Sequence, residues 1–313
     1  MIQKINNKDQ NLYHQQRFNP KLLPDLVNAG PVSASILFEA RNPIKFLKGM
    51  RKKKTEDMQW GSMVDMLWLT PKDWENHFCE LPEDAPKKPS IVQLNAKKPS
   101  QATIDAIAWW DIWNKNNIGK SVITKEVLYT VREARDMLDA HPIAREIWEN
   151  SDKQTIFQGV IPEPCSVKNV QAKAMLDLLP RTGKIEIENK IYPLDDCIVD
   201  LKQCHNVSEY GMKNAIMQFE YHMKMAWYRR IVQAYEQKTR PHTILIFQNK
   251  YPPHDVHVRI IDPKDMEDGA RLVQQRLDSL SKLDHRDIRP LFDLEVKTIS
   301  LTKWMREEKN KEQ

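Results

Sequence analysis

The segment Cys197-Ile198-Val199-Asp200-Leu201-Lys202-Gln203 combines the apolar composition of a buried β-strand with two charged side chains. Residues two apart on a strand point to the same face, so we expect Asp200 and Lys202 to share one face and Val199 and Leu201 to fill the other. Charges on a buried strand are costly unless they are paired or bind a ligand. The segment alone is therefore compatible with a structural ion pair or with a chemical site.

Two more acidic residues interrupt apolar segments elsewhere in the chain. Asp177 ends the strand-like segment 173–177, and Asp65 lies within the apolar helical segment 61–68. Each by itself is typical of an ordinary surface or capping acid. Together with Asp200 they offer three hard oxygen donors, which Mg²⁺ and Mn²⁺ prefer. Such an ion can lower the pKa of a bound water, and a neighbouring lysine can orient that water or stabilise developing negative charge.

The motifs of several other enzyme classes are absent. The sequence has no G-x-x-x-x-G-K-[ST] phosphate loop, no G-x-G-x-x-G, no H-E-x-x-H and no G-x-S-x-G. The four cysteines form no C-x-x-C pair, and the nine histidines are scattered. Cys204-His205 lacks the spacing of a zinc site, so we interpret these side chains as structural.

Neither a membrane segment nor an export signal is expected. No apolar run approaches the roughly 18 residues of a spanning helix, and residues 1–10 lack the apolar core of a signal peptide. Unpaired cysteines suit a reducing compartment. We therefore expect a cytoplasmic protein with no membrane partner.

The net charge of +5 is concentrated at the front of the chain. Residues 1–60 carry eleven basic and five acidic side chains, and the other residues are nearly balanced. The excess is clustered, with no acidic residue between its members, in Arg41, Lys45, Lys48, Arg51, Lys52, Lys53 and Lys54. Such a run suits a polyanion, and it is equally typical of a solvated helix end that serves solubility.

Hydrophobic periodicity predicts helices before strands. We expect Ser33 or Ser35 to begin a helix through Ala40, and Asn42-Pro43 to begin a second. Further helices are expected at 57–69, 102–113, 124–138 and 143–148, the last opened by Pro142, then at 208–237 and 263–283, and strands at 155–161, 170–177, 184–188, 197–203, 243–248 and 256–261. This order predicts one α/β or α+β domain with a helical N-terminal half and a small central mixed sheet flanked by helices.

Residues 82–113 contain a Pro- and Lys-rich stretch followed by a tryptophan cluster. We expect 82–100 to be an extended surface crossing. Trp109, Trp110 and Trp113 recur at helical spacing. They are compatible with base stacking, but aromatic residues at this spacing are usually core, so we expect them to be packed.

Asp177, followed 23 residues later by Asp200-Leu201-Lys202, resembles the PD-(D/E)XK nuclease pattern. More narrowly, the chain is similar to the RecE-type exonuclease domain (exodeoxyribonuclease VIII) of phages and prophages, over roughly residues 11–305. The likeness is carried by segments in order along the chain: 32–37 with Asn42-Pro43, 60–65, 96–100 ahead of 108–110, 140–142, 173–177, 198–202, 221–223 and 250–254.

Three positions depart from this family. Leu176-Asp177 stands where the family has Pro-Asp, and Asp65 aligns with its helical histidine, an expected metal ligand. Lys224 aligns with the glutamine of its Q-x-x-x-Y motif, whereas Tyr228 is retained. Lys224 and Tyr228 are i, i+4 neighbours on one helix face, and a cation at 224 can contact phosphate.

The resemblance implies a restriction-endonuclease-like core and a metal-dependent exonuclease that digests linear duplex DNA, from the 5′ end, to leave single-stranded tails for recombination. It implies that Asp177, Asp200 and the Leu201 carbonyl hold Mg²⁺, or Mn²⁺ in its place, that Asp65 completes the site, and that Lys202 positions or activates the attacking water. Tyr228 and Lys224 would hold the substrate strand, and the basic run would lead DNA into the site. A ring-shaped homo-oligomer and a single-strand annealing partner in a bacterial host cell are implied as well.

We expect residues 1–30 to be a loosely held lead-in, 31–305 one nuclease domain (helical over about 31–150, catalytic core over about 151–285) and 306–313 a charged tail. Two other functions stay open. One is a non-catalytic binder of DNA or of a partner on a nuclease fold, and the other is a single-strand nuclease or structure-specific endonuclease.

Overall fold

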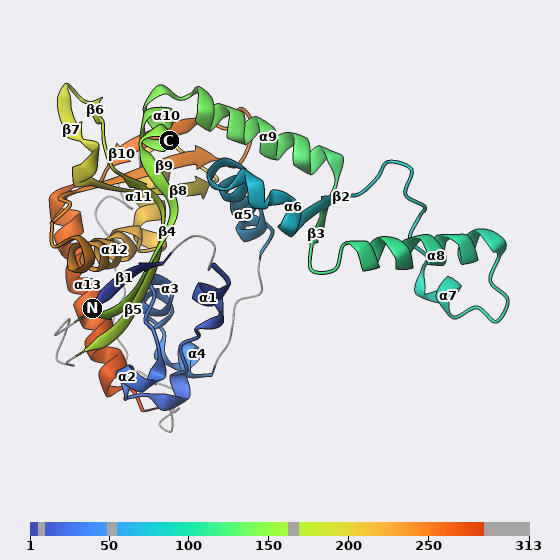
Figure 1. Ribbon diagram of the computed structural model, residues 1–313, viewed down its shortest axis with the longest axis horizontal. Helices are drawn as coiled ribbons and strands as arrows, with labels where there is room; N and C mark the ends of the chain where they lie inside the picture. The colour runs from blue at the N-terminus through green and yellow to red at the C-terminus, as the bar shows by residue number, and fades with distance from the viewer. Residues whose placement is uncertain (6–9, 49–54, 162–168, 285–313) are drawn as a thin grey trace, which may run out of the picture.

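The computed structural model describes residues 1–5, 10–48, 55–161 and 169–284. A six-stranded sheet in the order β1-β4-β5-β8-β9-β10 runs through the body (Figure 1). All its neighbours are antiparallel except β8 and β9, which are parallel. Its strands are β1 Ile2–Ile5, β4 Ser151–Ile161, β5 Val170–Pro180, β8 Cys197–Cys204, β9 His242–Asn249 and β10 Val256–Ile260. The predicted mixed sheet flanked by helices is confirmed.

Helices dominate the part of the chain before β4. They are α1 Gln10–Gln15, α2 Leu26–Ala29, α3 Ala34–Glu39, α4 Pro43–Leu47, α5 Glu56–Leu69, α6 Trp74–His77, α7 Ile91–Leu94, α8 Gln101–Asn116, α9 Lys125–Ala140 and α10 Pro142–Glu149, with short 3₁₀ helices at Pro20–Leu22 and Pro71–Asp73. Later come α11 Glu209–Gln218, α12 Tyr221–Glu236, α13 Pro263–Lys282 and a 3₁₀ helix at Leu194–Asp196. Two small strand pairs complete the fold: β2 Phe78–Glu80 with β3 Ser121–Ile123, and β6 Lys184–Ile187 with β7 Lys190–Pro193.

The predicted helix starts agree with the structure. The Ser33 hydroxyl accepts a hydrogen bond from the Ile36 N–H (3.4 Å), and the Asn42 side chain accepts one from the Lys45 N–H (3.1 Å). Pro142 is the first residue of α10. Polar caps and an early proline satisfy or remove the N–H groups that a helix start leaves unpaired.

The expected continuous helix over 208–237 is wrong. The chain breaks it into α11 and α12 at Glu220, whose φ of 50° is left-handed. The Glu220 carboxylate accepts a hydrogen bond from the Arg276 guanidinium of α13 at 3.0 Å. A tertiary ion pair therefore accompanies a backbone conformation that periodicity does not reveal. Together α11 and α12 form the crossover that parallel β8 and β9 require.

The first residues of the chain, within the expected lead-in 1–30, include a strand. Residues 2–5 form the edge strand β1, which pairs antiparallel with β4, and Ile2 is buried. Gly159 faces this strand with a φ of 151°, and a Cβ there would lie 2.2 Å from the Met1 carbonyl oxygen. The edge of the sheet therefore depends on the absence of a side chain at position 159.

The tryptophan cluster does not belong to the core, contrary to expectation. Trp109 and Trp113 are half-buried and stack on each other, with ring centroids 6.1 Å apart. Their helix α8 projects from the body beyond the β2–β3 pair (Figure 1). The tryptophans do recur at helical spacing, but their rings pack on one another rather than on the sheet.

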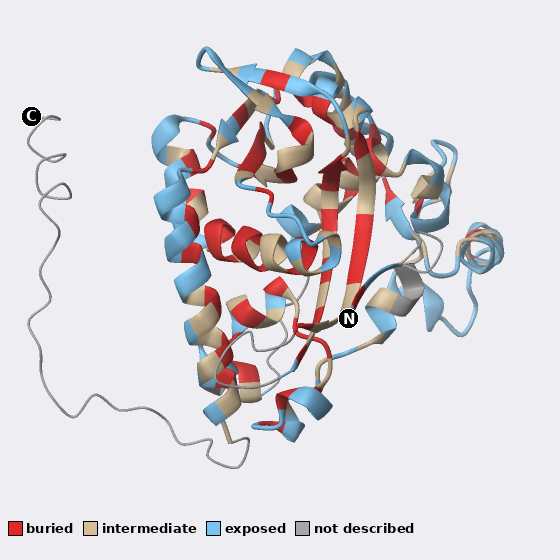
Figure 2. Cartoon of the chain, turned by 60° about the vertical axis from the view of Figure 1, so that its left-hand side comes forward, coloured by how far each residue is buried: buried red, intermediate tan, exposed pale blue. Residues whose placement is uncertain are grey.

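The sheet separates two hydrophobic clusters. On one face Ile198, Leu245 and Phe247 pack with residues of α3, α12 and α13; on the other Val199 and Leu201 pack with residues of α5, α9 and α10. Figure 2 shows the buried residues along the strands between exposed outer helices. Alternation along β8 thus places Val199 and Leu201 together, as predicted.

Arg240 connects three elements of the fold. Its guanidinium donates to the backbone carbonyls of Pro180 (2.8 Å) and Cys197 (2.9 Å) and forms a two-pronged pair with the Glu236 carboxylate (2.7 and 2.9 Å). Arg240 is 5% exposed. It therefore ties the end of β5, the start of β8 and the end of α12 together.

We predict that Arg240→Leu lowers the free energy of unfolding by about 3 to 5 kcal/mol, because it leaves the largely buried Glu236 carboxylate with fewer partners. Urea denaturation followed by circular dichroism measures the change. Lys213→Ala is the control, since it removes an exposed i, i+4 pair with Glu209 and should leave the free energy of unfolding nearly unchanged. Equal losses in the two variants would contradict the role given to Arg240.

Candidate functional site

Strands β5 and β8 diverge where the predicted acidic residues lie. Their antiparallel ladder contains one registered pair, Leu178 opposite Val199. Beyond it, the Leu201 N–H donates to the Asp177 carboxylate at 3.0 Å instead of to a strand carbonyl. The carboxylate of one strand thus satisfies a backbone group that the separation of the strands has freed. This brings Asp177 next to the Asp200-Leu201-Lys202 segment.

Lys202 lies at the centre of the acidic residues. Its ammonium forms an ion pair with Asp200 and donates to the Leu201 carbonyl at 3.0 Å. Asp200 is buried, as expected, and shares its face of β8 with Lys202. Burial lowers the pKa of Lys202, while the Asp177 and Asp65 carboxylates act in the opposite direction. The ion pair that the strand pattern allowed is present, and further carboxylates surround it.

Asp65 of α5 also faces this centre. Burial raises its pKa well above the ordinary value, the charge of Asp177 raises it further, and Lys202 lowers it. Within the described residues, its buried Oδ1 has no hydrogen-bond partner. The helix phase that places Val64 and Trp68 in the core therefore points Asp65 at the strands.

The donor set fits a hard divalent cation. Burial also raises the pKa of Asp177, against the influence of Lys202 and of the Leu201 N–H. Two carboxylates that repel each other in a buried setting, one with an unpaired oxygen, are the groups whose charge a cation would neutralise. In the described part of the chain, no three His, Cys, Asp or Glu side chains are already gathered tightly enough to surround one ion.

Gln154 is a member of the site that no pattern in the sequence indicated. It lies opposite Asp177 on β4, and its side-chain amide donates to the Asp177 carboxylate at 3.2 Å. Its φ is 47°, a left-handed conformation inside a strand. Such strain in a non-glycine residue is uncommon and is often found at functional sites.

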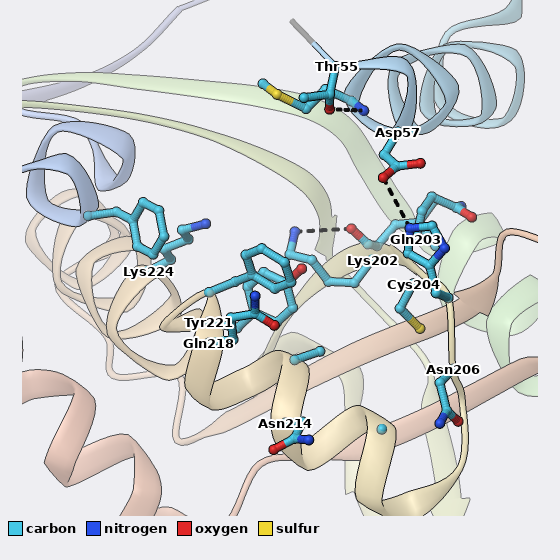
Figure 3. A pocket seen from close by; sticks show the side chains of 18 of the residues that line it. Thr55, Asp57, Lys202, Gln203, Cys204, Asn206, Asn214, Gln218, Tyr221 and Lys224 are labelled. Atoms are coloured by element: carbon cyan, nitrogen blue, oxygen red, sulfur yellow. Dashed lines mark hydrogen bonds and ion pairs between the residues drawn. The ribbon is translucent and has the colours of Figure 1, made fainter. Parts of the chain in front are cut away.

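A pocket of about 1040 Å³ opens beside Lys202. Lys202 and Leu201 reach it from β8 and Asp65 from α5, and side chains of α3, α11 and α12 complete its wall. In Figure 3, Tyr221 lies between Lys224 and Lys202. The Lys224 ammonium is 4.6 Å from the Phe38 ring centroid and 5.2 Å from that of Tyr221. The pocket is thus bordered by cations and aromatic rings.

Tyr228 occupies a different position from Lys224 although both belong to α12. It is half-buried against the core, and burial first, then the neighbouring Tyr13 and Asp177, raise its pKa. Tyr228 therefore lies near Asp177, whereas Lys224 lines the pocket. Lys224 and Tyr228, one helical turn apart, thus extend from the pocket wall to the region of the carboxylates.

The structure describes part of the basic run. Arg41, Lys45 and Lys48 are exposed on and beside α4. The Arg41 guanidinium lies 3.9 Å from the centroid of Phe38 and donates to the Gln218 carbonyl at 3.1 Å, so it borders the pocket. Arg51, Lys52, Lys53 and Lys54 lie outside the described residues.

A second polar group at the pocket was not predicted from the sequence. The Asp57 carboxylate pairs with the His205 ring (3.1 Å) and with Lys250, and the other nitrogen of His205 lies 3.1 Å from the Tyr251 hydroxyl. Hydrogen bonds from Lys250 and His205 lower the pKa of Asp57. This group connects the start of α5 to the loops that follow β8 and β9. No local motif could indicate it, because its members are far apart in the sequence.

Comparison with known proteins bears on the fold and the family of this chain. A solved structure described as a "putative exonuclease" from Eubacterium rectale is similar in fold, with a TM-score of 0.52, 12% sequence identity, and coverage of 96% of this chain and 97% of that chain. A search of curated proteins gives no match. The family model of a PDDEXK-like domain of unknown function (DUF3799) matches residues 39–292. The mixed sheet, the divergent strands with their Asp and Asp-x-Lys residues, and this match over most of the sequence agree: the chain belongs to the family of PDDEXK-like domains.

Proposed function

We propose that this protein is a metal-dependent nuclease that hydrolyses phosphodiester bonds of DNA. One observation carries the proposal: Asp65, Asp177 and Asp200 surround Lys202 at the wall of a pocket of about 1040 Å³. Three acids and a lysine come together here from three separate elements. Apolar residues would pack in these positions at a lower cost in free energy. They converge on Lys202, which lines the open pocket together with Asp65, and this arrangement supports a chemical role.

Each side chain has a role that follows from its contacts. Asp177 is oriented by the Leu201 N–H and by Gln154, so its carboxylate has a fixed direction. Asp65, Asp177 and Asp200, with the Leu201 carbonyl, would hold Mg²⁺ or Mn²⁺, which supplies a lowered pKa of bound water and neutralises phosphate charge. Lys202, released from Asp200, would position the attacking water and stabilise negative charge on the phosphate.

The substrate strand would follow the cationic side of the pocket. Lys224 and Arg41 border this side of the pocket and suit phosphate oxygens. Tyr228 lies near Asp177 and would contact the substrate strand there. Lys45 and Lys48 continue the positive surface outward. Together with Arg51, Lys52, Lys53 and Lys54, they would lead the DNA backbone towards the carboxylates.

Our finer proposal is a RecE-type exonuclease that digests linear duplex DNA from the 5′ end and leaves single-stranded tails for recombination. The sequence resemblance supports it, and so does the description of the Eubacterium rectale structure of similar fold as a "putative exonuclease". A closed homo-oligomeric ring, a single-strand annealing partner and a phage or prophage origin in a bacterial cytoplasm are part of the same proposal. No helix among the described residues is long and apolar enough to cross a membrane.

One observation favours a second candidate, a non-catalytic DNA-binding protein on the same fold. Lys202 is paired with Asp200. In that pairing the two side chains neutralise each other, as in a structural ion pair. Binding of DNA without cleavage would follow if this pair never opened.

We predict that the protein, in Mg²⁺ or Mn²⁺, releases nucleotides from an end-labelled linear duplex, and that Lys202→Ala slows release by about 10²- to 10³-fold. Asp200→Asn should abolish it, because the amide no longer offers an anionic donor. Lys213→Ala, on the exposed surface of α11, is the control and should retain full activity. DNA binding by the wild type without release in either metal would refute the nuclease and favour the binder.

The mode of attack is tested on circular DNA. We predict that a covalently closed plasmid resists digestion whereas its linearised form is degraded, and that label at the 5′ end is released before label at the 3′ end. Nicking or linearisation of the closed plasmid would instead indicate an endonuclease. Faster digestion of a single strand than of the duplex would contradict the duplex substrate.

We predict that Mn²⁺ stabilises the folded protein and that Asp65 contributes to this effect. At about 100 times its dissociation constant the ion adds about 2.7 kcal/mol to the free energy of unfolding. Asp65→Asn should raise the melting temperature in EDTA, because it removes a buried like charge beside Asp177, and should reduce the shift caused by Mn²⁺. Thermal melts with and without metal measure both.

Glu56→Gln provides the matched control, since Glu56 is an exposed acid in the first turn of the same helix. It should leave the Mn²⁺ shift unchanged. An unchanged shift in Asp65→Asn would exclude Asp65 as a ligand, whatever the nuclease assay shows.

A further inference from the structure

Residues 81–120 form an arm that leaves the body between β2 and β3 (Figure 1). Of these residues only Thr103 and Ala106 are buried. The 16 residues of α8 make the arm about 24 Å long at 1.5 Å per residue. The proposed catalytic mechanism makes no use of this arm.

The arm is anchored at its base and braced along its length. Phe78 of β2 and Ile123 of β3 are buried in the cluster that also holds Trp68 of α5, the helix of Asp65. The Trp110 indole N–H donates to the Pro86 carbonyl at 3.0 Å, which fastens the outgoing chain to α8. The arm is therefore a built projection with a fixed attachment to the helix that forms one wall of the pocket.

A short repeat distinguishes its far part. Lys87-Lys88-Pro89-Ser90 and Lys97-Lys98-Pro99-Ser100 have the same sequence. Ser90 caps α7 and Ser100 caps α8, each accepting a hydrogen bond at 3.3 Å from the N–H three residues on. Each lysine pair thus precedes a helix start by the same number of residues, and the two pairs bracket α7.

The bracketed surface is positive and apolar. Residues 85–104 contain four lysines and no acidic residue. Within the described parts of the chain, Lys87, Lys97 and Lys98 form no ion pair, and Lys88 lies 5.6 Å from the Trp110 ring centroid. The α7 side chains between the pairs are strongly exposed: Ile91 77%, Val92 81% and Leu94 54%.

We propose that the arm tip, residues 87–98, is a second binding surface for duplex DNA, separate from the candidate active site. The four lysines would contact phosphates, and the α7 side chains would contact sugars and base edges in the groove. The inference rests on the proposed function in taking DNA as the substrate. The segment lies along α8, since Lys88 lies 5.6 Å from the Trp110 ring centroid, so the duplex would be held beside that helix.

Charge favours DNA over a two-fold contact with a second copy of this chain as the occupant. A two-fold contact between two arm tips would bring the same four lysines against each other, because such an interface is made of the same patch on both subunits. Like charges opposed in this way are repelled. The phosphate backbone, in contrast, presents a negative charge to each lysine.

The test is the quadruple variant Lys87→Ala/Lys88→Ala/Lys97→Ala/Lys98→Ala in the full chain. Affinity for a 30-base-pair duplex is measured by fluorescence anisotropy in EDTA over a series of salt concentrations. We expect affinity to fall at least about tenfold and the slope of log K against log salt to shrink by about 3 to 4, since each phosphate contact contributes about 0.9. All four side chains are exposed, so the melting temperature should not change.

The control removes the same charge elsewhere: Lys184→Ala/Lys190→Ala/Lys264→Ala/Lys282→Ala, four exposed lysines of β6, β7 and α13. It should leave most of the affinity and of the salt slope. In single-turnover digestion of the long duplex, the arm variant should need more enzyme to reach half-maximal rate but keep the same maximal rate.

The outcomes separate this inference from the proposed nuclease. If the wild type binds DNA through the arm but never cleaves it, the nuclease proposal fails and the arm proposal stands. If the wild type cleaves and the arm variant binds and cleaves like the control, the arm proposal is overturned. A change of oligomeric state by light scattering, with DNA affinity intact, would also overturn it and assign the surface to a second copy.

Discussion

The joint between β5 and β8 is the constraint on which the site depends. These strands share one registered pair, and two side chains supply the bonds that a longer ladder would have made. At one end the Arg240 guanidinium donates hydrogen bonds to the Pro180 and Cys197 carbonyls. At the other end the Asp177 carboxylate accepts one from the Leu201 N–H. A buried backbone group left unpaired would cost about 1 to 3 kcal/mol. The Asp177 carboxylate, which lies where the two strands separate, therefore stabilises that separation.

Charge is concentrated where this opening lies. Burial raises the pKa values of Asp65 and Asp177, the charge of Asp177 raises that of Asp65 further, and burial lowers the pKa of Lys202. Such an arrangement destabilises the folded chain relative to an apolar one. Its persistence is explained if a cation and a phosphate group share the site, because each relieves part of the electrostatic cost that burial imposes.

The same helix, α5, relates the site to the rest of the molecule. Its first residues pair with the loops after β8 and β9 through Asp57, its middle presents Asp65, and its buried Trp68 shares a cluster with the base of the arm. The Asp65 carboxylate, the pocket wall and the projecting arm are thus all attached to one helix. In the proposed function, that element would relate the duplex held by the arm to the carboxylates that cleave it.

The sequence by itself determined the properties that are local in the chain. Period-two alternation placed Asp200 with Lys202 and Val199 with Leu201, and caps such as Ser33 and Asn42 located helix starts, because these depend on neighbouring residues. Tertiary structure decided the rest. The break at Glu220 is accompanied by an ion pair with Arg276, Gln154 takes its place through pairing of β4 with β5, and the tryptophan helix lies outside the core. Asp65 lies beside the other carboxylates because of the way α5 packs against the strands. No spacing in the sequence encodes this long-range relation.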